Sequence, residues 1–242
     1  MSEFIPGRNG VLEALKSGHS INKIFFAEGN QEGSIKQIIA IAKAKKIPTS
    51  VVPKNKLNEM FEGNHQGVIA AVASHDYVDV DDILAAAKNK GEAPFILMLA
   101  ELESPQNLGA IMRSADIAGV HGIIISKNNS VGLNATVAKV SAGATEYVPV
   151  ARVSNLVQTA KYLKEQGLWV YGADMAGTSL WEQEIKGAIL MVIGGEDRGI
   201  PRLLLENCDF KLSIPMQGHI SSLNAGAAAA IMMFEVVRQK TL

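Results

Sequence analysis

Cysteine, aromatic side chains and net charge are all scarce in this chain of 242 residues. The only cysteine, Cys208, excludes an internal disulfide and is typical of a reducing compartment. No stretch approaches the roughly 18 consecutive apolar residues of a membrane span, and the first ten residues lack the basic and apolar segments of a signal peptide. We therefore expect a soluble, cytoplasmic protein that is not bound to a membrane. The net charge of −1 leaves the class of partner open.

Several common sites are also missing. No GxGxxG motif follows a predicted strand, which argues against a dinucleotide fold and against the common Rossmann-type methyltransferases. The segment GADMAGTS at 172–179 resembles a phosphate-binding loop, but Thr178 stands where that loop needs lysine. The five histidines are scattered without the spacing of metal ligands, so no metal is expected. Cys208 has no evident activating base and is read as a small buried residue.

What the chain does have is apolar material, at 48% of residues against 19% charged, which is enough for a packed core. Its charge is uneven. Residues 1–73 hold nine Lys and Arg against six Asp and Glu, whereas residues 74–93 hold two against five. We therefore predict a basic front domain over residues 1–74, a linker over 75–93 with a short helix near 81–89, and a larger domain over 94–242.

Helices and strands alternate in the front domain. Its six lysines between residues 36 and 56 can be read as a surface that holds RNA phosphates or as ordinary solvated helix faces. His65, in a turn before a strand, is expected to be structural. The predicted elements are helices around 11–15 and 35–42 and strands at Lys23–Ala27, Thr49–Val52 and Val68–Ala73.

The back domain shows repeated strand–helix units. Several strands are continuous apolar runs, as expected for parallel strands covered on both faces, so we predict an α/β fold with a mainly parallel sheet. Ligands in such folds bind beyond the carboxyl ends of the strands. The predicted strands are Phe95–Leu99, Gly122–Ser126, Tyr147–Val150, Leu168–Gly172, Ile189–Gly194 and Phe210–Ile214, with helices near 107–118, 134–142, 154–166, 201–206 and 222–239.

Three segments near strand ends carry candidate functional residues. In SPQNLGAIMRSADIAG, residues 104–119, Asn107 is a candidate helix N-cap and Arg113 follows on the second turn. In IGGEDRGIP, residues 193–201, two glycines allow the backbone to approach a ligand closely. In the third segment, residues 214–239, a polar loop enters a helix rich in Ala and Gly, with Ser221, Ser222 and Asn224 at a helix start that favours anions. Taken singly, each segment also has an ordinary explanation: a cap, a chain reversal or a core helix.

Taken together and in this order, the segments resemble the SpoU, or TrmH, family of RNA ribose methyltransferases. The matching signatures are Asn107-Leu-Gly-Ala-Ile-Met-Arg113-Ser-Ala-Asp, Gly194-Gly-Glu196-Asp-Arg-Gly199, and Ile214-Pro-Met216 with Ser222-Leu-Asn224. The front domain, with GRNGVLEAL and HQGVIA, is similar to the family's ribosomal-protein-like RNA-binding extension. Whole-chain similarity is nearest to the bacterial subgroup that methylates a guanosine of large-subunit ribosomal RNA.

The resemblance implies a deep trefoil knot in the SPOUT-like back domain, a homodimer, S-adenosylmethionine as cofactor and RNA as substrate. It implies catalytic or polar site roles for Asn107, Arg113, Glu196, Ser222 and Asn224. It implies cofactor contacts at Gly172, Gly194, Gly195, Ile214, Met216 and Leu223. The chain departs from the family pattern at Ala225–Ala227, where the family usually has a small aliphatic residue, Ser and Val, and at Ser104, where an acidic residue is frequent.

The implied reaction is displacement at a sulfonium methyl by a ribose 2′-hydroxyl. The guanidinium of Arg113 is a poor base, so we expect it to stabilise negative charge on the 2′-oxygen or to hold a phosphate. Either an RNA phosphate or Glu196 could take the proton. Two rival functions remain open: methylation of transfer RNA, and a non-catalytic role in RNA binding or ribosome assembly.

Overall fold

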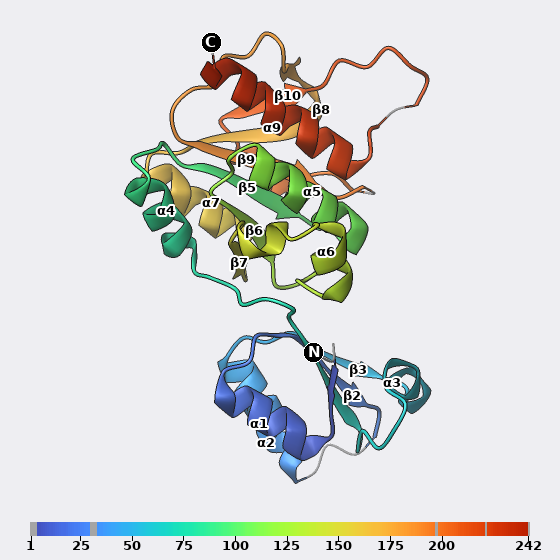
Figure 1. The fold of residues 1–242 in the computed structure, drawn as a ribbon. Helices are drawn as coiled ribbons and strands as arrows, with labels where there is room; N and C mark the ends of the chain where they lie inside the picture. Colours follow the sequence, from blue (N-terminus) through green and yellow to red (C-terminus); the bar gives the residue numbers. More distant parts are fainter. Residues whose placement is uncertain (1–3, 30–32, 197, 221, 242) are drawn as a thin grey trace. The chain divides into compact units, whose positions relative to one another are not determined.

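The computed structural model describes residues 4–29, 33–196, 198–220 and 222–241, and the chain divides into two compact units (Figure 1). The smaller unit comprises Met1–Asp76 with Gly132–Ala135, and the larger comprises Tyr77–Val131 with Thr136–Leu242. We describe each unit by itself. No helix within the described ranges is long and apolar enough to cross a bilayer.

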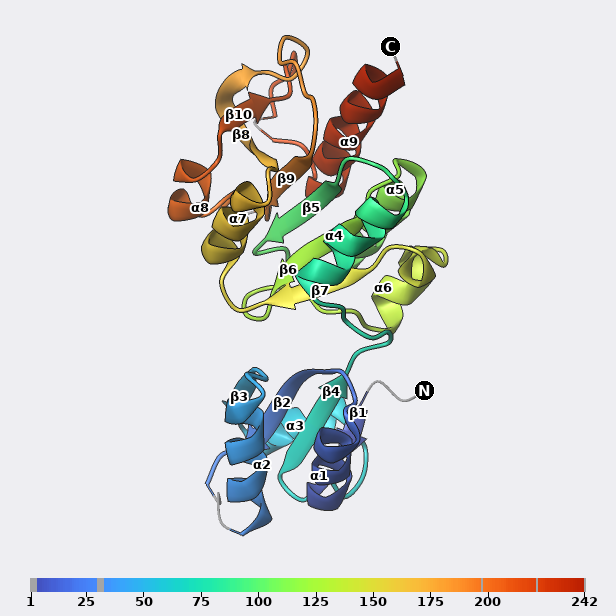
Figure 2. The same ribbon diagram turned by 90° about the vertical axis from the view of Figure 1, so that its left-hand side faces the viewer.

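The smaller unit is a four-stranded sheet with strand order β1-β4-β2-β3. Strand β4 is antiparallel to β1 and β2, and β3 is parallel to β2. Helices α1 and α2 lie side by side on one face of the sheet and α3 lies on the other (Figures 1 and 2). The elements are β1 (Phe4–Pro6), α1 (Arg8–Ser17), β2 (Ile21–Ala27), α2 (Ser34–Ala44), β3 (Thr49–Val52), α3 (Lys54–Met60) and β4 (Val68–Val72).

The larger unit contains a six-stranded sheet of order β10-β8-β9-β5-β6-β7 in which every pairing is parallel. This confirms the predicted α/β fold with a parallel sheet. The strands are β5 (Phe95–Ala100), β6 (Gly122–Ser126), β7 (Val150–Val153), β8 (Trp169–Ser179), β9 (Ile189–Gly194) and β10 (Phe210–Ser213). The helices are α4 (Val80–Asn89), α5 (Pro105–Ile117), α6 (Ala135–Val140), α7 (Leu156–Glu165), α8 (Arg202–Glu206) and α9 (Ala225–Thr241), with a 3-10 turn at Ala144–Glu146.

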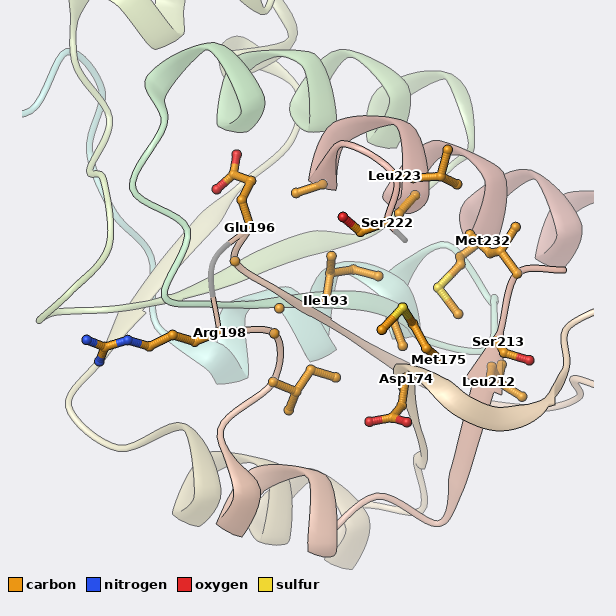
Figure 3. A pocket seen from close by; sticks show the side chains of 18 of the residues that line it. Asp174, Met175, Ile193, Glu196, Arg198, Leu212, Ser213, Ser222, Leu223 and Met232 are labelled. Atoms are coloured by element: carbon orange, nitrogen blue, oxygen red, sulfur yellow. The ribbon is translucent and has the colours of Figure 1, made fainter. Parts of the chain in front are cut away.

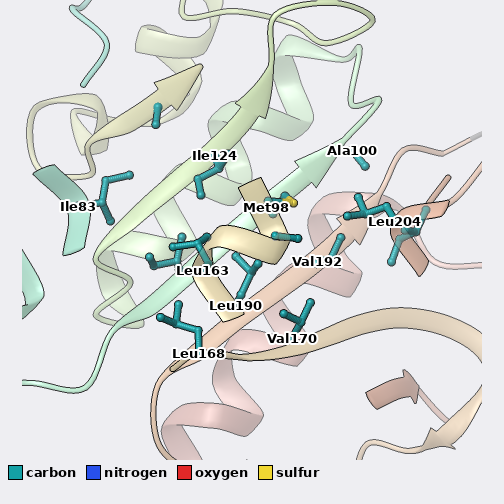
Figure 4. Packing of buried hydrophobic residues seen from close by; sticks show 14 residues of the cluster. Ile83, Met98, Ala100, Ile124, Leu163, Leu168, Val170, Leu190, Val192 and Leu204 are labelled. Carbon is teal, nitrogen blue, oxygen red and sulfur yellow. The ribbon is translucent and has the colours of Figure 1, made fainter. Parts of the chain in front are cut away.

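The core of the larger unit lies on both faces of this sheet. On one face, Met98, Ile124 and Val192 pack against side chains from α4, α7 and α8 (Figure 4). On the other face α5 and α9 pack against each other, and α9 also contacts β9. Because β5 is covered on both faces, all six of its residues are buried. The predicted trefoil knot is not traced by these pairings and stays a prediction.

Three sequence expectations differ from the structure. The strand predicted at Tyr147–Val150 begins only at Val150, because Tyr147 follows the 3-10 turn and is 76% exposed. Strand β8 runs on to Ser179 because its second half pairs with β10. The helix predicted near 81–89 is α4, but its Ile83 is fully buried in the core of the larger unit, so α4 packs with that unit and is not an exposed linker helix.

Candidate functional site

A cavity of about 510 Å³ opens where β9 and β10 reach their carboxyl ends, beside residues 173–175 in the middle of β8 (Figure 3). This is the edge at which parallel sheets bind ligands, and the volume lies within the range of small-molecule sites. In Figure 3, Glu196 and Arg198 lie at one end of the cavity, and Met175 and Met232 lie at the other. Asp174 and Ser213 lie beside the two methionines, so polar side chains occur at both ends and the methionines add apolar surface at one of them.

Two glycines let the backbone close tightly around this cavity. A Cβ atom added to Gly194 would overlap the backbone of Gly199 and Ile200, and one added to Gly195 would overlap the carbonyl oxygen of Glu101 at the end of β5. The Gly195 carbonyl accepts a hydrogen bond from the Gly199 amide at 3.1 Å, which folds the loop after β9 back on itself. The Gly-Gly sequence is thus required by the packing of the loop.

A chain of side-chain hydrogen bonds joins all three signature segments. The Nδ2 of Asn107 donates to Glu196 Oε1, and the Nδ2 of Asn224 donates to Asn107 Oδ1 at 3.0 Å. Asn224 Oδ1 in turn accepts from the Gly226 and Ala227 amides at the start of α9. Because free helix N–H groups face Asn224, its oxygen must point toward the helix. That orientation sets the direction of the chain out to the Glu196 carboxylate.

The helix cap of α5 differs from the sequence prediction. Ser104 is the N-cap, and its side chain accepts from the Asn107 amide at 3.3 Å, so the prediction of Asn107 as N-cap is wrong. The reason is Pro105, which is favoured at the first helical position because that residue needs no N–H partner. This arrangement leaves the Asn107 side chain available to contact Glu196 and Asn224.

The structure places most, but not all, of the predicted site residues at the cavity. Glu196 and Ser222 line it, as do the predicted cofactor residues Gly194, Gly195, Ile214, Met216 and Leu223. Gly172 does not line it; this glycine packs against Cys208, whose Sγ would lie 2.8 Å from an added Cβ. Asn107 and Asn224 do not line the cavity. Asn107 is hydrogen-bonded to Glu196, which does, and Asn224 is hydrogen-bonded to Asn107. Ser221 lies outside the described residues.

Arg113 is not brought to the cavity within one chain. It lies exposed on α5 and lines neither this cavity nor the smaller polar cavity that adjoins it. It has no hydrogen-bond or ion-pair partner among the described residues.

A smaller polar cavity of about 320 Å³ adjoins the first and shares Gly195, Glu196 and Arg198 with it. Glu101 and Glu103, which follow β5, line its other side. The site therefore consists of the larger cavity with a polar annex at Glu196. No group of three His, Cys, Asp or Glu side chains among the residues described could hold a metal ion.

Sequence reasoning missed Asp174, Met175, Arg198 and the annex. Asp174 lies just beyond the predicted end of β8, in the segment considered only as a failed phosphate-binding loop, and its Oδ1 accepts from the Ala176 amide at 2.8 Å. The signal that could have found it is its position directly after the predicted strand. Cys208 takes no part: burial raises the pKa of its thiol to about 11, so it stays protonated.

Comparison with known proteins identifies the family of both parts of the chain. Residues 94–234 match the model of the SpoU rRNA Methylase family, and residues 4–78 match the domain described as RNA 2′-O ribose methyltransferase substrate binding. The chain is 46% identical over 239 residues to YacO of Bacillus subtilis, a protein named as a TrmH family tRNA/rRNA methyltransferase, covering 98% of this chain and 96% of that one.

Solved structures share the fold. The SpoU methyltransferase AviRb from Streptomyces viridochromogenes, in complex with AdoMet, has a TM-score of 0.62 at 22% identity and covers 98% of this chain and 90% of that chain. The AdoMet-bound rRNA methyltransferase from Sinorhizobium meliloti has a TM-score of 0.62 at 23% identity, covering 97% and 86%. With its larger unit matched by the methylase model and its smaller unit by the substrate-binding model, the chain belongs to the SpoU rRNA methylase family.

Proposed function

We propose that this protein transfers a methyl group from S-adenosylmethionine to a ribose 2′-hydroxyl in structured RNA, with a guanosine of large-subunit ribosomal RNA as the target. The observation that carries the proposal is the hydrogen-bonded chain from α9 through Asn224 and Asn107 to Glu196, at the junction of the two cavities. It unites the three signatures of an RNA methyltransferase family at one point. Family membership supports the reaction class, and the front domain favours ribosomal RNA.

The larger cavity fits the cofactor. Backbone groups at Gly194, Gly195, Ile214 and Leu223, which line the cavity, would hold it. Apolar side chains in the lining, including Met232, suit the face of an adenine ring. When bound, the cofactor supplies an activated methyl group, which leaves placement of the acceptor and charge stabilisation to this chain.

The annex suits the acceptor. Asn107 donates to the Glu196 carboxylate and so fixes it at the boundary between the two cavities, and Arg198 adds a guanidinium that can hold an RNA phosphate. We assign Glu196 to receive or orient the 2′-hydroxyl proton. No metal is needed for this arrangement.

We further propose that the active form is a homodimer in which Arg113 completes the site of the partner. Two large apolar side chains support a buried face here: Ile117 on α5 is 66% exposed and Phe234 on α9 is 44% exposed. The two helices pack together, and Arg113 lies on α5. A cation that reaches no site in its own chain would gain one across a twofold axis.

Two alternatives remain. A transfer RNA substrate is the first, since the relatives are named for both kinds of RNA. A non-catalytic role in ribosome assembly is the second, and the joined network of Asn107, Glu196 and Asn224 argues against it.

The deciding experiment is a map of ribose methylation across total RNA from the parent strain and from a strain lacking this protein, with the purified protein then added back to the undermethylated RNA. We expect one guanosine of large-subunit RNA to lose its mark and to regain it in the presence of S-adenosylmethionine. A site lost from transfer RNA would support the first alternative. Unchanged RNA in both tests would contradict the proposed activity.

A further inference from the structure

The smaller unit carries a cavity of its own, about 760 Å³ in volume, that the methyl-transfer reaction does not use. It lies where the loop before β4 meets the start of α1 and the start of α3. Its lining includes the apolar side chains of Ile35 and Ala27. Its rim is polar and includes Arg8, Lys54, Asn58 and Gln66.

A buried histidine fixes one side of this rim. His65 is only 3% exposed, and its Nδ1 accepts a hydrogen bond from the Gly67 amide at 3.1 Å. The ring proton therefore lies on Nε2, which donates to Asn58 Oδ1 at 2.8 Å. This bond orients the Asn58 amide, and its NH₂ group has no partner among the described residues. His65 is a positioning residue, in line with the structural role expected from the sequence.

Gln66 and Arg8 fix the other side. Gln66 Oε1 accepts from the Arg8 amide at 3.1 Å, and the Gln66 carbonyl accepts from Arg8 Nε at 3.3 Å. Gln66 has a φ of 49° and Gly67 a φ of 80°, so this turn has a defined left-handed shape. The bonds leave the Gln66 NH₂ and both terminal nitrogens of Arg8 without partners among the described residues.

The rim is therefore preorganised as a set of donors. The lining residues include Arg8, Lys54, Asn58 and Gln66 as donors, with Asn64 and the carboxylate of Glu28 beside them. Such a set fits a ligand with a phosphate and several acceptor atoms. The apolar side chains of Ile35 and Ala27 in the same lining fit the flat face of a nucleobase.

We propose that this cavity binds one unstacked nucleotide of the RNA substrate, with Arg8 and Lys54 on its phosphate and with Asn58 and Gln66 on acceptor atoms at the base edge. The inference rests on the proposed function in taking RNA as the ligand. It assigns substrate recognition to a discrete, single-stranded feature of the RNA. The alternative is a diffuse basic surface made by the lysines of the front domain.

Isosteric variants of the full-length protein test the donor set. Gln66→Glu and Asn58→Asp keep the oxygens that accept from Arg8 and His65 but replace each NH₂ donor with a second oxygen. Arg8→Ala removes the phosphate fork. Lys43→Ala is the matched control, because Lys43 is an exposed cation of the same domain that lies outside the cavity. Thermal unfolding of each variant shows whether it is folded.

Binding is measured by fluorescence anisotropy with a labelled RNA hairpin carrying an unpaired loop, and with the fully paired duplex of the same length. We expect Gln66→Glu and Arg8→Ala each to weaken hairpin binding about tenfold, and Lys43→Ala to weaken it less than about twofold. Duplex binding should be weaker for the wild type and insensitive to Gln66→Glu. Equal losses from Lys43→Ala and Arg8→Ala, or equal affinity for hairpin and duplex, would overturn the proposal.

Methyl transfer by the wild type separates this inference from the proposed function. If the wild type methylates RNA and the cavity variants bind and methylate as well as it does, the cavity has no role and the enzyme stands. If the cavity variants lose RNA binding while the wild type transfers no methyl group, the cavity stands and the proposed activity fails.

Discussion

Arg113 is the residue whose environment says most about how the site is completed. Its guanidinium is exposed and unpartnered within the described chain, yet it belongs to the signature whose Asn107 reaches Glu196. A residue held only for surface solubility would tolerate any polar replacement. A residue that serves the partner's site would not.

The first prediction concerns mixed dimers. Arg113→Ala should lower methyl transfer by roughly a hundredfold, and Arg113→Lys should restore little because lysine lacks the planar fork. Ala228→Phe should be inactive because Ala228 lines the larger cavity. A heterodimer of Arg113→Ala with Ala228→Phe should recover activity, since one intact cavity then meets one intact arginine. If the mixture stays as inactive as its parts in single-turnover assays, Arg113 does not act across the dimer.

The second prediction isolates cofactor binding. Ala228→Phe should abolish binding of S-adenosylhomocysteine in calorimetry, because the new ring fills the cavity. Ala85→Phe is the matched control, on the exposed face of α4 and outside the lining. Its binding should equal that of the wild type. Retained binding by Ala228→Phe would place the cofactor elsewhere.

The third prediction tests the hydrogen-bonded chain. Asn224→Asp keeps an oxygen to cap α9 but removes the NH₂ that donates to Asn107. We expect thermal stability to hold while the methylation rate falls about tenfold or more, because Asn107 loses the donor that orients it toward Glu196. Asn155→Asp makes the same change at the cap of α7, where the side chain accepts from the Gln158 amide, and should leave the rate unchanged. Similar methylation rates for the two variants would show that the hydrogen bonds linking Asn224, Asn107 and Glu196 have no role in methyl transfer.

Residue roles were predictable where a signature carried them, and the structure shows the limits of that source. Glu196 and Ser222 line the cavity, whereas Gly172 packs against Cys208 and does not line it. Asp174 belongs to no recognised signature, and only the path of β8 brings it to the rim. A sequence pattern specifies which residues a family keeps but not which cavity wall each one forms.

At the scale of elements, α9 links the cavity to the far side of the larger unit. Near its end, the buried carboxylate of Glu235 accepts from Arg238 Nε at 2.8 Å and from Gln239 Nε2 at 2.7 Å. Gln239 also accepts from the Ile185 amide and donates to the Gln183 carbonyl. The helix that contributes Ala228 and Met232 to the cavity is thus tied to the segment before β9.

The fourth prediction follows from this anchor. The hydrogen bond from Arg238, together with that from Gln239, lowers the pKa of Glu235. Its stabilising contribution is therefore complete above the ordinary Glu pKa near ~4.3 and is lost as the pH falls through the lowered value. Arg238→Met should lower the midpoint of urea unfolding at pH 7, because the buried carboxylate of Glu235 loses its charged donor.

The pH dependence supplies the check. The difference in unfolding midpoint between Arg238→Met and the wild type should narrow as the pH falls through the lowered pKa and Glu235 becomes protonated. The control Arg202→Met breaks an exposed pair with Glu206 and should cost at most about 1 kcal/mol. If Arg238→Met loses no more stability than the control, or if its loss of stability does not change with pH, the bonds from Arg238 to Glu235 do not stabilise the protein.

The longer elements were predictable because apolar runs and helical spacing are strong signals. Strands β5, β6 and β9 and helices α5 and α7 lie within a few residues of their predicted positions. Strand β1 has three residues and α3 has seven, too few for a pattern to be distinguished. The composition of Tyr147–Val150 is typical of a strand, but Pro149 has no N–H to donate, and the hydrogen-bonded strand β7 begins at the next residue.

At the scale of the whole molecule, the division into units revises where the catalytic part begins. The charge pattern placed α4 in a linker, but Ile83 occupies the space beside Gly122 in which an added Cβ would lie 2.6 Å away. The charged residues of α4 lie on its exposed face, so the charge pattern gives no information about the face that is buried. Its buried face belongs to the sheet of the larger unit.

The fifth prediction compares two fragments. A fragment starting at Tyr77 should fold and bind S-adenosylhomocysteine while losing most of the RNA affinity. One starting at Glu92 lacks α4 and should be less stable by roughly 2–5 kcal/mol, the scale of losing large core side chains. Chemical unfolding and calorimetry on both decide this. Equal stability of the two fragments would show that α4 does not stabilise the larger unit and acts as a linker.

The order of the cavity's walls along the chain has a consequence for synthesis. All its lining residues fall between Ala173 and Met232, and α9 supplies the last of them. During translation the front domain can fold first, so a nascent or prematurely terminated chain would carry the domain that matches the substrate-binding model before it could hold a methyl donor. If that domain binds RNA by itself, as we propose, we expect such a chain to occupy the substrate without modifying it and a nonsense mutation after β7 to inhibit the intact enzyme in the same cell.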